Sequence, residues 1–215
     1  MKVQLIKLTI ISTIMLIGCG QEKKEEPVNL KATKSMNPKV QEELAIISTQ
    51  FGDMVLEFYE RAAPKHVESF KLHVKNGFYD GTIFHRVIPG FMIQGGDPNT
   101  KGEDVMSYGM GGHAAKFYGF GDESNMNSWK LPAEFNDIKH TKGILSMARS
   151  NDKNSAGSQF FICDGNPSHL DAQYTVFGRV IEGLDIIDKI AGLPRDNRNN
   201  PLKRINMKIK LKLKD

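Results

Sequence analysis

Two runs of sequence, far apart in the chain, place the same two kinds of side chain next to each other. In FHRVIPGFMIQGGD (residues 84–97), a Pro-Gly pair reverses the chain and a strand returns from the turn. Side chains alternate between the two faces of a strand, so Met92 and Gln94 share one face. In the later run GSQFFI, Gln159 and Phe161 share a face in the same way. Each strand therefore presents an apolar side chain beside an amide.

Short strands separated by turn residues make up most of the chain after residue 44. Besides the returning strand, we expect strands at 45–48, 54–58, 82–87, 143–147, 159–163, 174–180 and 205–213. Apolar residues at helical spacing predict one helix from Pro64 to Asn76 and a shorter one over 181–191. The inward-facing residues of the second helix are expected to be Leu184, Ile187 and Ala191. About seven or eight short strands with two helices predict a mainly β barrel or sandwich whose open ends the helices cover.

The two runs resemble the cyclophilin family closely, as do GILSMA from Gly143 and VFGRV from Val176. The resemblance extends, in the family's order, over nearly all of residues 44–213. It implies a closed eight-stranded antiparallel β-barrel capped by two α-helices, with X-Pro peptides bound on the outer surface of the barrel. It also implies peptidyl-prolyl cis-trans isomerase activity on proline-containing polypeptides, without a cofactor or a metal.

The same resemblance assigns roles to individual positions. Arg86 occupies the position of the catalytic arginine. The residues expected to bind the peptide are Phe91, Met92, Gln94, Ala148, Arg149, Gln159, Phe161, His169, Leu170 and Tyr174. His169 stands where many eukaryotic members have the Trp that is tied to tight cyclosporin binding, so we predict weak inhibition by cyclosporin.

Each of these side chains has a plainer interpretation when it is taken alone. Phe91, Met92 and Phe161 are apolar residues of the kind that usually fill a core, and a lone Arg86 is usually a surface ion pair. Their joint occurrence with the two glutamines favours the functional interpretation. A module that holds proline-containing segments without turnover is the alternative function. A metal-dependent hydrolase is disfavoured, because the six histidines are scattered without metal-ligand spacing.

The region from Gly109 to Pro132 is longer than in short members of the family and is rich in glycine and polar residues. Loops of this length inside a compact domain are usually functional or disordered. Phe117, Phe120 and Trp129 within it favour a lid or an extension of the peptide groove, and a surface loop without a role in binding is an equal alternative.

Residues 1–18 have a basic start followed by an apolar run that is too short to span a bilayer comfortably, as in a signal peptide. The run ends in LIGC, which resembles the lipobox of bacterial lipoproteins, where the chain is cut before the Cys and the Cys carries the lipid. Lipidation is therefore predicted at Cys19. The alternatives are an ordinary secretory signal and a retained membrane helix, and Ser12 and Thr13 disfavour the helix.

Residues 19–43 are polar and charged, which predicts a flexible tether between the lipidated Cys19 and one isomerase domain at 44–215. An additional amphipathic helix at 38–44 is the alternative. These features predict a protein of the bacterial cell envelope, anchored to a membrane with its domain outside the cytoplasm, on the periplasmic or surface side. We expect a monomer.

Charge and cysteine content limit the other partners. Removal of residues 1–18 lowers Lys+Arg from 29 to 27 against 25 acidic residues, so we expect no nucleic-acid partner. The lysines near the C-terminus alternate with apolar residues, which predicts a strand with one solvated face. With Cys19 lipidated, Cys163 has no partner for a disulfide and is expected to be a buried, unreactive thiol.

Overall fold

The computed structural model describes residues 42–214. The predicted signal peptide, the lipidated Cys19 and nearly all of the predicted tether lie outside these residues. Neither helix between residues 42 and 214 is long and apolar enough to cross a membrane.

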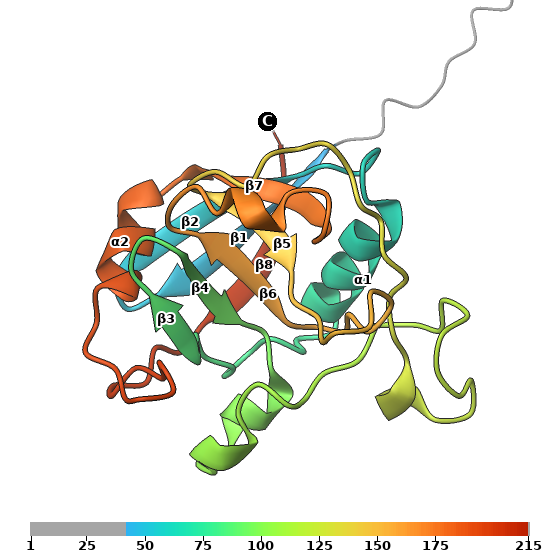
Figure 1. Ribbon diagram of the computed structural model, residues 1–215, viewed down its shortest axis with the longest axis horizontal. Helices are drawn as coiled ribbons and strands as arrows, with labels where there is room; N and C mark the ends of the chain where they lie inside the picture. Colours follow the sequence, from blue (N-terminus) through green and yellow to red (C-terminus); the bar gives the residue numbers. More distant parts are fainter. Residues whose placement is uncertain (1–41, 215) are drawn as a thin grey trace, which may run out of the picture. The chain divides into compact units, whose positions relative to one another are not determined.

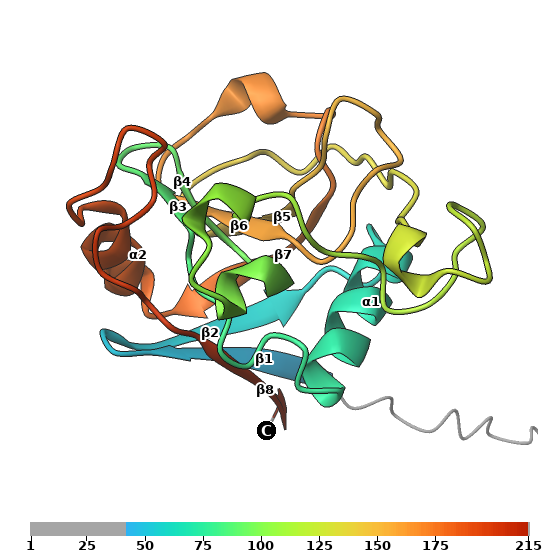
Figure 2. The same cartoon turned by 90° about the horizontal axis from the view of Figure 1, so that it is seen from below.

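Eight strands form one antiparallel sheet with the order β3-β4-β6-β5-β7-β2-β1-β8. The strands are β1 (Glu43–Thr49), β2 (Gly52–Phe58), β3 (Arg86–Ile88), β4 (Met92–Gly95), β5 (Ile144–Met147), β6 (Phe160–Cys163), β7 (Val176–Glu182) and β8 (Lys208–Leu213). The helices are α1 (Pro64–Lys75) and α2 (Leu184–Ala191), and they lie at opposite ends of the sheet (Figure 1, Figure 2). The short 3-10 turns are η1 (Pro98–Lys101), η2 (Val105–Ser107), η3 (Met126–Ser128) and η4 (Ser168–Leu170).

The sheet curls into an open half-barrel, so the expected closed barrel is wrong. Its edges, β3 and β8, share no ladder within residues 42–214. The segments that precede them meet at the isolated bridge between Ile83 and Asn206, where three backbone hydrogen bonds join 81–84 to 205–207. The outer side of β3 is already occupied, because the Val87 amide donates to the Asn199 carbonyl at 2.9 Å. A loop therefore fills the place that a closing strand requires.

Alternation of side chains explains how the strands bury the core. Ala45 and Ile47 in β1 are fully buried, and they pair in register with Leu56 and Met54 in β2. The ladders of β7 with β2 and with β5 each contain a shift of register, and such irregularities increase the local twist and bend of a sheet. The curled sheet thereby encloses one continuous apolar core.

Helix α1 fills one end of this core with Phe70. The ring of Phe70 is fully buried, and its centroid lies 5.1–5.7 Å from four other aromatic rings. These rings belong to Phe58, Tyr79, Phe160 and Phe177. Aromatic pairs at this spacing add to the energy of area burial, so Phe70 couples the helix to strands from both halves of the sheet.

Three other expectations need correction. The strand expected at 82–87 begins only at Arg86, apart from the bridge at Ile83. Strand β7 continues to Glu182, and Gly183 at φ +84° separates it from α2, which therefore begins at Leu184. Leu184 is exposed rather than inward-facing, because the buried side of the shorter helix consists of Ile186, Ile187, Ile190 and Ala191.

A carboxylate that is distant in sequence caps the N-terminus of α1. Glu134 accepts hydrogen bonds from the backbone amides of Lys65 and His66 at 3.0–3.1 Å and lies 2.7 Å from His66 Nδ1. Burial by itself raises the pKa of Glu134, but these hydrogen bonds outweigh it, and the pKa lies below its ordinary value. A negative charge at this end of a helix also interacts favourably with the helix dipole.

Substitution Glu134→Gln tests this cap. We expect the free energy of unfolding to fall by about 2 kcal/mol, because the backbone amides of Lys65 and His66 would then donate to a neutral acceptor instead of a charged one. Urea unfolding followed by circular dichroism measures the loss. The matched control is Glu68→Gln on the exposed side of α1, where the contacts to Lys116 and Tyr118 are on the surface and a loss below about 1 kcal/mol is expected. Equal losses in the two variants contradict a special role for Glu134.

Candidate active site

Three neighbouring strands bring the predicted side chains together. Arg86 in β3 pairs with Gln94 in β4, and Gln94 pairs with Phe161 in β6. Residues that pair across an antiparallel ladder lie on the same side of the sheet, so all three side chains are on one face. The positions come from segments that the sequence separates widely, and the strand order makes them adjacent.

A depression of about 100 Å³ lies on the outer face of these strands. Its lining is formed by Arg86, Phe91, Met92, Gln94, Ala148, Arg149, Phe161, Leu170 and Tyr174. All nine are among the residues predicted from the sequence. The other two are nearby: His169 stacks on the ring of Phe91 with centroids 5.7 Å apart, and Gln159 bonds to Gln94.

The floor of the depression is apolar and firmly packed. Met92, Phe161 and Leu170 belong to a second buried cluster, separate from the main core, with Cys163 and Val176. The far side of the Phe161 ring faces His140, which is stacked on it at 15° with centroids 6.1 Å apart. Cys163 is the buried free thiol that the sequence predicts, and burial raises its pKa to about 12.

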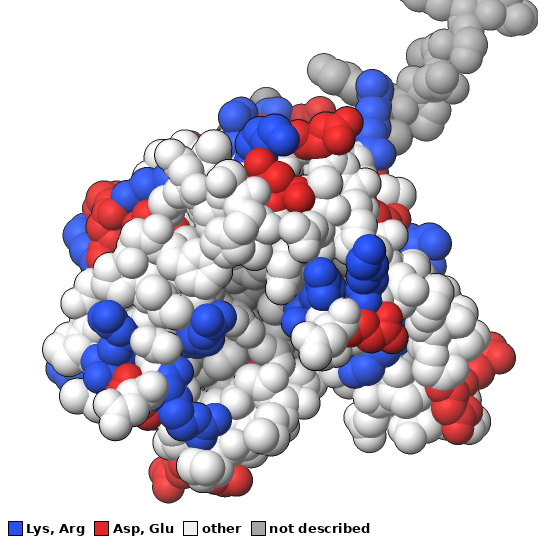
Figure 3. All heavy atoms as spheres, viewed as in Figure 1, with Lys and Arg blue, Asp and Glu red and all other residues white. Residues whose placement is uncertain are grey.

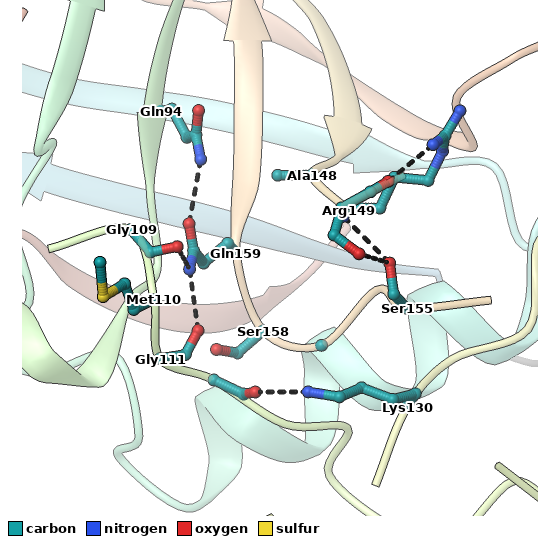
Figure 4. Close-up of a pocket in the computed structure, with 13 residues that line it drawn as sticks. Gln94, Gly109, Met110, Gly111, Lys130, Ala148, Arg149, Ser155, Ser158 and Gln159 are labelled. Atoms are coloured by element: carbon teal, nitrogen blue, oxygen red, sulfur yellow. Dashed lines mark hydrogen bonds between the residues drawn. The ribbon is translucent and has the colours of Figure 1, made fainter. Parts of the chain in front are cut away.

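The wall of the depression is polar, and a chain of hydrogen bonds runs along it. Arg86 Nη1 donates to Gln94 Oε1 at 3.3 Å, and Gln94 Nε2 donates to Gln159 Oε1 at 2.9 Å. Gln159 Nε2 in turn donates to the carbonyls of Gly109 and Gly111 at 3.0 and 2.8 Å, as Figure 4 shows. The guanidinium of Arg86 also lies 5.9 Å from the centre of the Phe91 ring.

The opposite wall is held by Arg149. Its guanidinium lies 4.4 Å from the centre of the Tyr174 ring and donates to the Gln173 carbonyl. Ala148 lies beside it, with its amide bonded to the Gln159 carbonyl. The described lining therefore contains two cationic side chains and no carboxylate. Burial lowers the pKa of Arg86 somewhat, and Tyr174 opposes this shift.

A second, polar cavity of about 270 Å³ adjoins the first, and of the predicted site residues only Gln94, Ala148, Arg149 and Gln159 line it. The two linings share Gln94, Ala148 and Arg149. The rest is supplied by the turn 109–112, by Lys130, by Ser150 and Ser155, and by 157–159 (Figure 4). The glycine-rich run GMGG was the available signal, since glycines allow the backbone to approach another segment closely.

The long region between β4 and β5 forms two projections, one with η1 and η2 and one with η3 (Figure 1). Within the stretch from Gly109 to Pro132, only the two ends, at 109–112 and Lys130, line the polar cavity. Phe120 and Met126 on the η3 projection are exposed, and Trp129 packs against Phe117. The space-filling view in Figure 3 shows the face of the molecule that is seen in Figure 1. This face is hollowed near its centre, and charges of both signs are interspersed over it.

His85 is buried behind the site rather than in it. Its side chain is 3% exposed, and it is absent from the lining of both cavities. Burial lowers the pKa of His85 to about 4, although the charge of Asp97 acts in the opposite direction. The ring is therefore neutral at physiological pH. Between residues 42 and 214, no group of three His, Cys, Asp or Glu side chains has an arrangement that suits a metal ion.

Comparison with known proteins identifies the family of this chain. The family model for cyclophilin-type peptidyl-prolyl cis-trans isomerases matches residues 44–210. The chain belongs to the cyclophilin family. Like the other cyclophilins that it matches, it is a peptidyl-prolyl cis-trans isomerase.

Relatives of this cyclophilin are found in bacteria and eukaryotes. A probable isomerase of Brucella abortus is 40% identical over 167 residues, which cover 76% of this chain and 79% of the relative. An isomerase of Dictyostelium discoideum is also 40% identical, over 77% of this chain and 95% of its own. A solved cyclophilin of Cryptosporidium parvum, crystallised in the presence of the dipeptide Ala-Pro, superposes with a TM-score of 0.66 and 30% identity. It covers 80% of this chain and 99% of its own.

The buried histidines of this cyclophilin predict a loss of stability in mild acid. Burial lowers the pKa values of His73 and His85 to about 4 from 6.5. Between pH 6.5 and 4 the unfolded chain therefore binds protons that the folded chain does not, so stability falls as pH falls. From pH 7 to 5 we expect a loss of about 2 kcal/mol for each histidine, measured by urea unfolding. His73→Gln should remove about half of this dependence, and an unchanged slope would show that His73 does not cause it.

Proposed function

We propose that this isomerase accelerates X-Pro rotation in polypeptides outside the cytoplasm, with Arg86 as its catalytic residue and Cys19 as its lipid anchor. The proposal for Arg86 is carried by one observation. The half-buried guanidinium of Arg86 lies beside a depression of about 100 Å³ with an apolar floor, and the described lining has no carboxylate to bind it.

The mechanism follows from the electronic structure of the amide. The barrier to rotation is about 18–20 kcal/mol, because the nitrogen lone pair is delocalised into the carbonyl. Twisting localises the lone pair on nitrogen. A guanidinium N–H can donate a hydrogen bond to this nitrogen, and that hydrogen bond becomes strong only as the amide twists. The interaction therefore lowers the barrier to rotation rather than merely tightening binding.

The other side chains hold the two parts of the substrate. Phe91, Met92, Phe161 and Leu170 would hold the proline ring in the apolar depression. Gln94, Gln159 and the backbone at Ala148 would orient the peptide beside it, and Arg86 would be left with free N–H groups. Rotation then occurs on the acyl side, which faces the polar cavity. No bond is broken, and the chemistry needs no nucleophile.

Replacement of Arg86 decides between an isomerase that uses this residue and a binding module. For Arg86→Ala we expect exchange of an Ala-Pro test peptide, measured by NMR with the full chain, to slow about 100-fold, because one transition-state donor is lost. Binding of the peptide should change much less. Arg86→Lys should recover only part of the rate, since a single ammonium lacks the planar array of donors.

The control for this experiment is Arg179→Ala, which removes a surface arginine that pairs with Glu57 at 2.6 Å and lies outside the site. Wild-type exchange in Arg86→Ala would refute the catalytic role. Slow exchange in the wild type, with the peptide bound, would instead favour the binding module that the sequence left open.

The extracytoplasmic location is supported by the sequence of the N-terminus. The run LIGC ends at Cys19, and the polar residues after it suit a tether of the domain to a membrane. A single acyl chain binds membranes reversibly, so stable anchoring takes a second chain or a polybasic patch beside it.

Substitution Cys19→Ala tests the anchor in a bacterial host. We expect the wild-type protein to fractionate with membranes and to incorporate labelled fatty acid, and the variant to incorporate none. The signal for export remains in the variant, so retention of the label would exclude Cys19 as the modified residue. Isomerase activity should be the same in both proteins, because the predicted anchor is separate from the described domain.

A further inference from the structure

The carboxylate of Asp97 is fully buried close to the site, and the mechanism above gives it no part. It is the N-cap residue of η1, and its Oδ1 accepts from the Asn99 amide at 2.8 Å. Its second oxygen reaches across to another segment. Oδ2 accepts from the amide of Gly109 at 2.5 Å and from that of Gly111 at 3.4 Å.

These two glycines are the residues whose carbonyls accept from Gln159. One carboxylate therefore accepts from the N–H groups of this turn. The C=O groups of the same turn accept from Gln159 Nε2, as Figure 4 shows. The turn lies so close to Asp97 that a methyl group at Gly111 would overlap the carboxylate. Gly109 has φ +87°, which also favours glycine.

The direction of the hydrogen bonds gives this contact its consequence. Backbone carbonyls can only accept, so Gln159 must turn its Nε2 to the glycines and its Oε1 to Gln94. Gln94 must then donate its Nε2 to Gln159 and present its Oε1 to Arg86, which can only donate. The turn thereby ensures that an acceptor, rather than a competing donor, faces the guanidinium.

Arg86 needs such a fixed acceptor. Among the described residues its guanidinium has no ion pair. Besides the hydrogen bond to Gln94, it lies near the face of the Phe91 ring. A free arginine side chain has about 2 kcal/mol of rotamer entropy, so its productive orientation is populated only if a neighbour selects it. Gln94 is that neighbour, and its own orientation is set from the turn.

We infer that Asp97 is a positioning residue for isomerisation, which acts on Arg86 through Gly109, Gly111, Gln159 and Gln94. This rests on the proposed catalytic role of Arg86. In the Asp97→Asn variant, an amide replaces one of the two accepting oxygens and cannot accept at both sides. A carboxamide offers one neutral oxygen to the three N–H groups of Asn99, Gly109 and Gly111, so the turn is held more weakly. Gln159 is then less constrained, and the guanidinium samples unproductive orientations.

The chain contains a matched control. Asp104 is the N-cap residue of η2 in the same region, and it accepts from the Met106 amide at 3.1 Å. Unlike Asp97, it is exposed, and its side chain makes no hydrogen bond to the turn at 109–111. For Asp97→Asn in the full chain we expect kcat for an Ala-Pro peptide to fall about tenfold and KM to stay within twofold. For Asp104→Asn both should remain within twofold of the wild type.

A double-mutant cycle separates positioning from a general loss of structure. If Asp97 acts through Gln159, Asp97→Asn added to Gln159→Ala should lower kcat no further than Gln159→Ala alone. A second tenfold loss in the double variant overturns the inference, because it shows an effect that bypasses Gln159. The side-chain amide signals of Gln94 and Gln159 in the NMR spectrum should shift in Asp97→Asn and not in Asp104→Asn.

Gly111→Ala tests the same step from the side of the turn and covers the case in which Asp97→Asn does not fold. Its methyl group should displace the turn from Asp97, and its loss of kcat should also vanish in the Gln159→Ala background. An independent loss again overturns the inference. Wild-type exchange in Arg86→Ala would instead remove the proposed function itself, whereas loss in Arg86→Ala with none in Asp97→Asn or Gly111→Ala removes only the role of Asp97.

Discussion

The outer face of β4 and β6 has buried apolar side chains as well as the inner one, and the site depends on this. An antiparallel sheet commonly buries one face and exposes the other. Here Ile93 and Ile162 point into the main core, while Met92 and Phe161 point outward into the second cluster. The floor of the depression is therefore part of the folded interior, so substitutions that hollow it should weaken stability and, in the proposed binding mode, substrate binding together.

The polar wall is built from neutral groups around a charged one. A carboxylate within reach of Arg86 would occupy the N–H groups of the guanidinium in a strong bidentate pair. The amide of Gln94 accepts one such group at 3.3 Å and leaves the others free. Neutral acceptors thus orient the cation without neutralising it. The buried carboxylate of Asp97 reaches Arg86 only through the turn at 109–111 and the side-chain amides of Gln159 and Gln94.

Local patterns predicted the parts of this protein that depend on local spacing. The shared faces of Met92 with Gln94 and of Gln159 with Phe161 followed from strand alternation, and the structure has both pairs in one wall and floor. Residues that act across long sequence distances escaped prediction. Glu134 caps α1 and Asp97 holds the turn at 109–111, but neither position has a periodic signal, because each depends on where another segment returns. The open sheet was missed for the same reason. Asn199 lies in a loop distant in sequence, and its carbonyl occupies the outer side of β3, where a closing strand would pair.

The arrangement of the two cavities suits proline within a long chain. They lie side by side and share Gln94, Ala148 and Arg149, so a segment that leaves the apolar depression passes directly into the polar one. Both lie on the outside of a curled sheet rather than inside it, where the core is filled by rings such as Phe70 and Phe160. In the proposed binding mode, an extended polypeptide would have access from the surface without any need to thread an end. Rotation about one bond would displace only the part of the chain over the polar cavity.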